Sequence, residues 1–313
     1  MSSNLGSIHA AHRRAVTARS PAKVNLQLSV GARRPDGYHN LVTVFHAVGL
    51  YDEVVASPGS GRVSVSLSGI SDGDVPLGDD NLAVRAALAL AEATGVDADV
   101  HLELRKTIPV AGGMAGGSAD AAAALLACDA LWGTHLERHE LMALAAGLGA
   151  DVPFALLGGT AVGLGTGTRL TSALARGRFH WVLAFAEHGL STAEVYAEYD
   201  RLAAIGLEPE VSDALMSALR AGDAVALGRS LSNDLQRAAV SLRPRLRLTL
   251  DVGEEYGALG AIVSGSGPTC AFLARDEEHA LDLAVALTAA DVCRAVARAD
   301  GPVAGARVVE DTG

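Results

Sequence analysis

The sequence predicts an α+β fold divided into two domains, and three observations lead to this prediction. About the first third of the chain consists mostly of strand-like segments, helices follow, and the second half mixes both kinds. A doubly wound parallel sheet would instead show strands and helices alternating along the whole chain. A length of 313 residues accommodates two domains of ordinary size. We expect a flexible tail over residues 1–17, a first domain over 18–168 and a second over 169–313.

Strands dominate the first part of the chain. Polar and apolar residues alternate over 22–30, which is typical of a half-buried strand, and 33–37 is typical of a turn. Residues 81–94 carry apolar side chains at helical spacing, and Gly95 ends this helix. The further elements expected here are strands at 41–50, 52–57, 62–68 and 100–105, helices at 119–132 and 137–147, a turn at 149–154 and a glycine-rich β segment at 158–167.

The second half combines buried strands with amphipathic helices. Residues 179–186 form an apolar run short enough for a strand, and 192–204 has the apolar spacing of a helix. The further elements expected are two or three helices within 211–240, helices at 244–256 and 277–290, strands at 261–263, 269–274 and 292–297, and a turn at 264–268.

Composition and charge restrict the classes of protein that fit the chain. A formal net charge of −11 argues against a general nucleic-acid-binding surface. The three cysteines lie far apart in apolar runs, so we expect buried thiols rather than a disulfide framework or a metal site. Residues 1–15 are polar and unlike a signal peptide, and no apolar run is long enough for a membrane span. We expect a cytoplasmic enzyme without nucleic-acid or membrane partners, present as a monomer or a homodimer.

A glycine-rich loop is the most informative segment. The run Pro-Val-Ala-Gly-Gly-Met-Ala-Gly-Gly-Ser-Ala-Asp at 109–120 lies between a strand-like segment and an alanine-rich helix. Glycine allows the backbone to take positive φ and to approach a ligand closely. A loop that leads into a helix directs N–H groups and the positive end of the helix dipole at one point, which suits a polyphosphate. The Gly-Lys-[Ser/Thr] ending of a Walker A loop is missing. The alternative is a tight turn in a core of small residues.

Two further segments place polar groups among apolar neighbours. Lys23 and Asn25 lie two residues apart on a predicted strand, so their side chains project from one face and can hold an anion. The alternative is a solvated strand face. Asp151 comes just before Val152 and Pro153, and we expect Pro153 to keep Val152 out of helical geometry. The Asp151 carboxylate is then either a general base or a helix cap.

An aromatic pair and a second small-residue turn complete the candidate site. Tyr38 and His39 offer an aromatic face beside hydrogen-bonding groups, a combination that suits a nucleobase or a sugar. The Ser-Gly-Ser-Gly-Pro run at 264–268 can present backbone N–H groups to phosphate, although a turn between strands also needs glycine.

Taken in order, these motifs resemble those of the GHMP kinases, the superfamily of galactokinase, homoserine kinase, mevalonate kinase and phosphomevalonate kinase. The motifs that carry the resemblance lie at 21–26, 34–41, 109–118, 149–154 and 264–269. The resemblance implies an N-terminal ATP-binding α+β domain and a ferredoxin-like C-terminal α+β domain that binds the substrate. It also implies ATP as co-substrate, Mg²⁺, and phosphate transfer to an alcohol group of a small molecule that carries cytidine diphosphate.

The resemblance also implies a role for each matching residue. Asp151 would be the catalytic base and Lys23 would hold the acceptor oxygen. Tyr38 and Tyr196 would stack on the two faces of cytosine, and His39 would hydrogen-bond to it. The residues implied to bind the acceptor are Asn25, Tyr38, His39, Thr192 and Tyr196. The residues implied to bind ATP are Asn81, Lys106, Pro109, Val110, Ala111, Gly112, Gly113, Met114, Ala115, Gly116, Gly117, Ser118, Ala119, Gly265, Ser266 and Gly267.

The glycine loop departs from the family pattern in two places. Met114 and Ala115 stand where the superfamily commonly has Leu-Gly, and an alanine at 115 is tolerable only if its φ is negative. Ala119 replaces a frequent serine, which leaves Ser118 as the hydroxyl for phosphate or Mg²⁺. Asp120, in the first turn of the helix, either complements the helix dipole or lies beside the metal.

Two other functions stay open at this point. One is another GHMP-type kinase with a mevalonate, homoserine or sugar acceptor. Tyr38, His39 and Tyr196 argue against it, because a nucleobase needs a second aromatic slot and these acceptors do not. The other is a non-catalytic nucleotide-binding protein on the same fold. Lys23 and Asp151 argue against that function, since such a protein needs neither.

Overall fold

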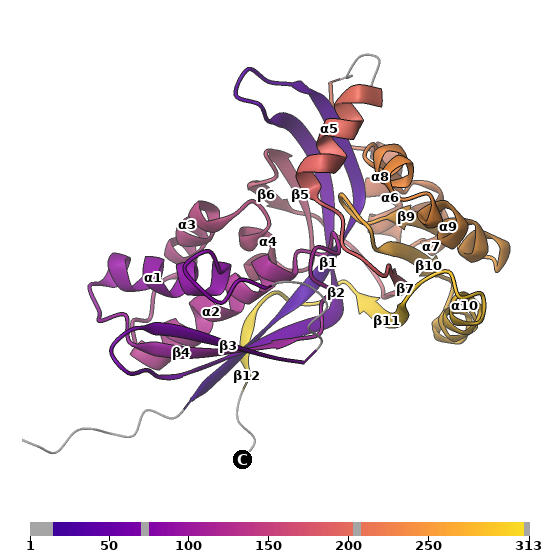
Figure 1. The fold of residues 1–313 in the computed structure, drawn as a ribbon. Helices are drawn as coiled ribbons and strands as arrows, with labels where there is room; N and C mark the ends of the chain where they lie inside the picture. Colours follow the sequence, from indigo (N-terminus) through magenta and orange to yellow (C-terminus); the bar gives the residue numbers. More distant parts are fainter. Residues whose placement is uncertain (1–14, 70–74, 203–207, 310–313) are drawn as a thin grey trace, which may run out of the picture.

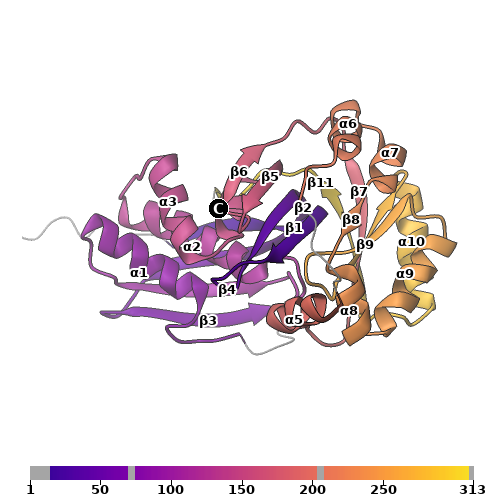
Figure 2. The same ribbon diagram turned by 90° about the horizontal axis from the view of Figure 1, so that it is seen from above.

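The computed structural model describes residues 15–69, 75–202 and 208–309. The expected tail over 1–17 therefore lies outside the described residues, apart from its last three. Two of these, Val16 and Thr17, already belong to the first strand, β1 (Val16–Arg33). Figures 1 and 2 show two halves, with helices α1–α3 on one side and helices α6–α10 on the other, and the β1–β2 pair between them.

The first sheet is built on the long antiparallel pair β1 and β2 (His39–Pro58). Its strand order is β12-β1-β2-β4-β3, where β3 is Val63–Gly69, β4 is Val100–Lys106 and β12 is Arg307–Val309. The expected strands at 41–50 and 52–57 are one strand, because a register shift at Pro21/Ala22 bends the pair without interrupting β2. β5 (Thr160–Gly165) pairs with the other end of β2, β6 (Arg169–Ser172) pairs with β5, and β8 (Ser232–Asn233) pairs with β1.

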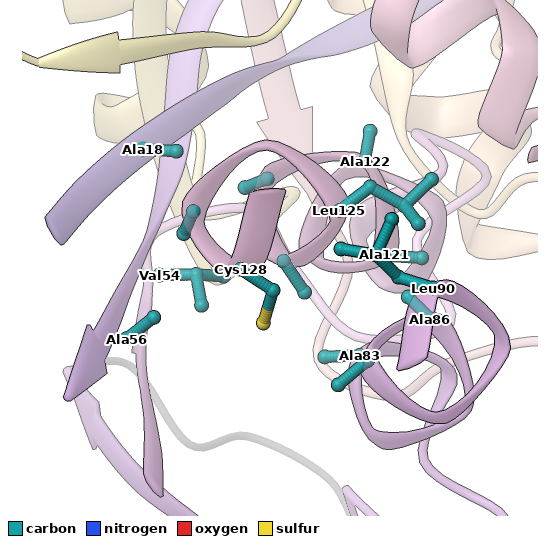
Figure 3. Close-up of a cluster of buried hydrophobic side chains, with 14 of the residues drawn as sticks. Ala18, Val54, Ala56, Ala83, Ala86, Leu90, Ala121, Ala122, Leu125 and Cys128 are labelled. Atoms are coloured by element: carbon teal, nitrogen blue, oxygen red, sulfur yellow. The ribbon is translucent and has the colours of Figure 1, made fainter. Parts of the chain in front are cut away.

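Four helices pack beside the first sheet: α1 (Leu82–Thr94), α2 (Gly116–Trp132), α3 (Arg138–Leu148) and α4 (Val152–Leu157). The α2 helix begins three residues earlier than expected, within the glycine loop. Its alanines and Cys128 pack between α1 and the strands (Figure 3). Small side chains let the backbones approach closely, so this core needs few aromatic residues. The turn expected at 149–154 is wrong in part, because Val152 already begins α4. Pro153 sits in the first turn, where its missing N–H leaves no helical hydrogen bond unmade.

The second sheet has the order β11-β7-β10-β9 and is antiparallel throughout. Its strands are β7 (Phe179–Phe185), β9 (Gly260–Val263), β10 (Cys270–Ala274) and β11 (Ala295–Gly301). With α9 (Arg245–Glu255) and α10 (Glu277–Ala289), the chain runs β7-α9-β9-β10-α10-β11. This split βαβ arrangement confirms the ferredoxin-like half of the predicted α+β fold. Inserted between β7 and α9 are α5 (Thr192–Leu202), α6 (Asp213–Ala221), α7 (Ala224–Arg229) and α8 (Gln236–Leu242).

The second half of the chain contributes strands to the first sheet. The expected division at 168/169 falls inside the β5–β6 hairpin, so the first sheet continues to Ser172. The chain then returns to this sheet at its far end, where β12 pairs with β1. Sequence patterns did not predict β6 or β12, because both are short and gain their order from pairing with distant strands. The expected strand at 292–297 begins instead at Ala295.

A buried core joins the two halves. Val24 and Leu26 of β1 and Val44 of β2 pack with Trp181 and Leu183 of β7. The alternate residues of β7, including Val182, face α8, α9 and α10 instead. This alternation is the period-2 pattern of a strand covered on both faces.

His46 of β2 lies fully buried in this junction, beside the rings of Phe179 and Trp181. Its Nδ1 is 2.9 Å from the Thr160 hydroxyl. Burial lowers the pKa of His46 from 6.5 to about 3, although the neighbouring backbone of Gly301 opposes the shift. The imidazole is therefore neutral in the folded protein at any pH above this value.

We expect this histidine to make the protein sensitive to acid. Below a pH of 6.5 the unfolded chain binds a proton at His46 that the folded chain does not bind. The free energy of unfolding should then fall by about 1.4 kcal/mol for each pH unit lost, until the folded pKa is reached. Urea unfolding at a series of pH values checks this, with His46→Gln as the comparison. In the variant, the free energy of unfolding should fall less steeply as the pH is lowered below 6.5. An identical pH dependence in the two proteins would contradict the role assigned to His46.

Candidate active site

A cavity of about 890 Å³ lies where the two halves meet. Its wall is formed by β1, the glycine loop, the residues before α4, α5, and the turn before β10. The expected site residues that line it are Lys23, Asn25, Tyr38, His39, Ala111, Gly112, Gly113, Ala115, Gly116, Gly117, Ser118, Asp151, Thr192, Tyr196, Gly265 and Ser266. Segments far apart in the sequence thus meet around one space.

The glycine loop is held against the turn at 264–268. Gly113 has φ +75, and a Cβ on it would lie 2.2 Å from the carbonyl oxygen of Ser264, so this position requires glycine. The Ser264 hydroxyl donates to the Gly113 carbonyl at 3.1 Å, and the Thr269 N–H donates to Gly112 at 3.2 Å. The loop of the first half and the turn of the second therefore form one structural unit.

The helix α2 starts from this loop with its N-terminus toward the cavity. Gly116, Gly117 and Ser118 form its first turn and line the cavity. Backbone N–H groups in a first turn have no helical carbonyl to bind, and with the helix dipole they favour an anion. The arrangement is a phosphate-binding geometry that depends on backbone groups.

Ala115 precedes α2 with φ +60, so the negative φ that an alanine here was expected to require is not the one it adopts. The chain must turn sharply there from the loop into the helix, and the left-handed conformation makes that turn. For an alanine this conformation costs about 1–2 kcal/mol. Glycine would adopt it without a steric penalty.

Ala115→Gly is therefore expected to raise the free energy of unfolding by about 0.5–1 kcal/mol, after allowance for the greater freedom of glycine in the unfolded chain. Chemical denaturation measures the change. Ala119→Gly is the matched control, because Ala119 lies within α2 and glycine there should destabilise by about 1 kcal/mol. Destabilisation by both variants would contradict the strain assigned to Ala115.

Lys23 and Asp151 meet in this cavity. The Lys23 ammonium donates to Asn25 Oδ1 at 2.6 Å and to the Gly113 carbonyl at 2.7 Å, and it lies 4.0 Å from Asp151 Oδ2. Burial lowers the pKa of Lys23, and the Asp151 charge opposes this shift. Lys23 is 6% exposed and Asn25 is 3% exposed. The alternative that both residues lie on a solvated strand face is therefore wrong.

Asp151 occupies the N-cap position of α4 without acting as a cap. Within the described part of the chain, its side chain accepts no capping hydrogen bond from the helix. Its carboxylate instead lines the cavity and faces Lys23. Asn25 completes the group, since its amide donates to the Thr43 hydroxyl at 2.8 Å and leaves its oxygen on Lys23.

The other end of the cavity is aromatic. The ring of His39 stacks on Tyr196, with centroids 5.3 Å apart and planes at 29°. Tyr38 is 66% exposed at the mouth of the cavity. The Thr192 hydroxyl lies 2.9 Å from that of Ser266 and joins α5 to the 264–268 turn. The structure thus brings Tyr38, His39 and Tyr196 to one end, but the face of Tyr196 carries the histidine ring.

The remaining predicted residues lie outside the cavity wall. Asn81 caps α1 by accepting from the Ala83 N–H at 2.9 Å. Pro109 and Val110 line a separate small hollow beside residues 185–189. Met114 and Ala119 pack in the core between the two halves. Gly267, with φ +78, is the residue before the cis proline of the 264–268 turn.

Lys106 lies beneath the loop in a buried ion cluster. Its ammonium donates to Asp52 Oδ2 and, at 2.6 Å, to Asp120 Oδ2. Asp52 Oδ1 accepts the N–H groups of Thr107 and Ile108, at 2.6 and 2.8 Å. Burial raises the pKa of Asp120 to about 7, and the Lys106 charge opposes the rise. Asp120 is therefore a structural partner of Lys106 rather than a group facing the cavity.

Sequence reasoning did not single out Asp52 or Asp200, although Asp200 lines the cavity. One signal pointed to the buried cluster, because Lys106 is one of the two lysines in the chain and the other is Lys23. Among the described residues, no group of three or more His, Cys, Asp or Glu is arranged to hold a metal ion. No helix in that part of the chain is long and apolar enough to cross a membrane.

Comparisons with known proteins agree on one family. The models of the GHMP kinases N-terminal domain and C-terminal region match residues 81–159 and 215–292. Over 301 residues the chain is 56% identical to a 4-diphosphocytidyl-2-C-methyl-D-erythritol kinase of Thermobifida fusca, which covers 94% of this chain and 98% of that relative. A kinase of the same name from Streptomyces coelicolor is 56% identical over 298 residues, which cover 94% and 99% of the two chains. A crystal structure of 4-(cytidine 5'-diphospho)-2C-methyl-D-erythritol kinase aligns with a TM-score of 0.76 at 36% identity, covering 91% of this chain and 98% of that one.

Proposed function

The chain belongs to the GHMP kinase family, and on this premise we propose that it phosphorylates the 2-hydroxyl of 4-diphosphocytidyl-2-C-methyl-D-erythritol. ATP is the co-substrate, and the products are the 2-phosphate and ADP. The protein is a phosphotransferase with an alcohol acceptor, in isoprenoid precursor biosynthesis by the non-mevalonate route. The net charge of −11 supports small-molecule partners rather than nucleic acid.

One observation supports the site assignment most strongly. Lys23 of β1 and Asp151 before α4 converge to 4.0 Å at the opening of the glycine loop. A hydroxyl group that lies between them contacts an ammonium and a carboxylate at once. This is the pair of groups that an alcohol needs in order to attack a phosphoryl group.

The reaction follows from these positions. Phosphoryl transfer requires in-line alignment and neutralisation of charge on the transferred group. The first turn of α2 and the glycine loop supply N–H donors for the ATP phosphates. Asp151 accepts the proton of the 2-hydroxyl while the oxygen of that hydroxyl forms a bond to the γ-phosphorus. The bond from that phosphorus to the β–γ bridging oxygen breaks, and ADP leaves. Lys23 stabilises the negative charge that develops on the acceptor oxygen.

We propose Mg²⁺ as the ion that accompanies ATP. Magnesium in kinases is held by one or two protein oxygens together with phosphate oxygens and waters, so a dedicated cluster of carboxylates is not needed. Ser118 fits this requirement, since it lies in the first turn of α2 and lines the cavity. When bound, Mg²⁺ would neutralise charge on the β- and γ-phosphates.

A coupled assay of ADP release tests the function. The cytidine-linked acceptor should be phosphorylated with kcat/KM at least 100-fold above that for mevalonate, homoserine or galactose. Turnover of one of those acceptors in its place would assign a different GHMP kinase activity. Nucleotide binding without turnover of any of the four acceptors would identify a non-catalytic protein.

Tyr38→Ala is expected to raise the KM for the cytidine-linked acceptor about tenfold or more, because stacking of a base on an aromatic ring contributes about 1–3 kcal/mol. The KM for ATP should stay within about twofold of the wild-type value. Steady-state kinetics with each substrate varied in turn measure both. Tyr256→Ala is the control, since Tyr256 is exposed at the end of α9. Equal changes in both KM values would remove Tyr38 from the cytosine site.

A further inference from the structure

The carboxylate of Asp200 lies at the aromatic end of the cavity. Asp200 follows Tyr196 by four residues on α5, so the two side chains lie on the same face of the helix. It lines the cavity together with His39 and Arg33, and its side chain is 30% exposed. A partly buried carboxylate that lines the cavity at this place can accept a hydrogen bond from a base bound there.

His39 has both ring nitrogens directed at acceptors of the protein. A carbonyl oxygen cannot donate, so Nδ1 donates to the Gly31 carbonyl at 2.8 Å. Nε2 lies 3.3 Å from Asp200 Oδ1. The His39 side chain is 5% exposed, its face lies on Tyr196 and both nitrogens face protein groups, so the imidazole presents little polar surface to a base. A base bound at this end of the cavity would instead contact the Asp200 carboxylate, which lies next to His39 Nε2.

The Asp200 carboxylate can accept further hydrogen bonds from a ligand. A carboxylate has about four lone-pair directions, and here His39 and Arg33 approach two of them. The Arg33 guanidinium lies 3.8 Å from Asp200 Oδ2 and is 64% exposed. An acceptor and a donor therefore lie side by side at the end of the cavity.

This order of acceptor and donor distinguishes cytosine from uracil. Cytosine carries an amino group beside the acceptor N3, so its amine can donate to a carboxylate while N3 accepts from a guanidinium. Uracil has a carbonyl in place of the amine, and that oxygen would face the carboxylate. Asp and Glu are the side chains that accept from the cytosine N4 amine where proteins distinguish bases in DNA.

We propose that Asp200 accepts a hydrogen bond from the exocyclic amine of cytosine, and that with Arg33 it makes the enzyme select a cytidine diphosphate over a uridine diphosphate acceptor. This inference rests on the function proposed above. It assigns base selection to α5 and not to the Tyr38–His39 segment alone.

The test compares the cytidine-linked acceptor with its uridine counterpart. The wild-type kcat/KM should favour cytidine about 10–100-fold, the discrimination given by one well-placed contact to a base edge. Asp200→Asn should lose about tenfold or more on the cytidine acceptor and little on the uridine one, because the amide can donate to the uracil carbonyl. The ratio of the two kcat/KM values should then fall by about tenfold or more. Glu194→Gln, an exposed residue in the first turn of α5, should leave both values unchanged.

The possible outcomes separate this inference from the proposed function. Equal losses on both acceptors in Asp200→Asn would mean that Asp200 merely supports His39, and would overturn the inference. A second measurement needs no variant: CDP should compete with the acceptor at least tenfold more strongly than UDP, and equal inhibition would overturn it too. If the wild-type enzyme phosphorylates neither acceptor, the proposed function itself fails.

Discussion

Asp151→Asn is expected to lower kcat by about 10²–10⁴-fold, the contribution of a positioned general base. The amide keeps the shape of the side chain but cannot accept the proton of the acceptor hydroxyl. Because Asp151 caps no helix within the described residues, the fold should be unaffected. The KM values for ATP and for the acceptor should change far less than kcat. Steady-state kinetics give the rates, and circular dichroism with urea unfolding checks the fold.

Two other variants make this result specific. Lys23→Ala should also lose most of the turnover, since it removes the ammonium 4.0 Å from Asp151. Asp251→Asn is the matched control, because this half-exposed carboxylate pairs with Arg247 on α9. It should retain wild-type kcat. Near-normal activity in Asp151→Asn would rule out its role as the base.

Lys106→Met should reduce the free energy of unfolding by about 3–5 kcal/mol, the cost of leaving buried charges without their partner. Asp52 and Asp120 both depend on this ammonium, and their side chains are at most 5% exposed. Asp120 Oδ1 already has no hydrogen-bond partner among the described residues. The carboxylate therefore has no other hydrogen bond at this oxygen to compensate for the lost Lys106 ammonium. Urea unfolding measures the change, and a lower yield of folded protein is expected with it.

Arg105→Met provides the comparison for Lys106. Arg105 is the preceding residue of β4, but its side chain is about half exposed and its ion pairs with Glu53 and Glu103 lie at the surface. Such pairs contribute about 0–1 kcal/mol. Similar destabilisation by the two substitutions would mean that the buried cluster does not support the loop.

Local patterns predicted most of the fold because most elements follow from local chemistry. The apolar spacing of α1, its Asn81 cap and Gly95 at its end all lie within one stretch of sequence, and the structure contains this helix. The secondary-structure predictions fail where an element depends on segments far away in the sequence. β6 and β12 depend on strands far away in the chain. The turn expected before Phe154 became α4 because a proline in a first turn stabilises a helix as readily as it ends one.

The candidate site shows the same division. The pattern at Lys23 and Asn25 predicted a shared face, and the structure has both side chains there. No local pattern linked Lys106 with Asp52, because these residues meet through the pairing of β2 and β4. Asp200 was likewise one of several acidic residues on a helix until the fold brought it to His39. The glycine loop was predictable from local sequence, but Asp52 beneath it and Asp200 at the aromatic end of the cavity were not.

The pairing of β12 with β1 has a consequence for biosynthesis of the chain. The first sheet obtains its edge strand from residues 307–309, which leave the ribosome after the whole ferredoxin-like half. The nascent N-terminal half therefore cannot complete its sheet until the ferredoxin-like half has been synthesised. For the same reason, a chain truncated before residue 307 would lack an edge strand of the first sheet.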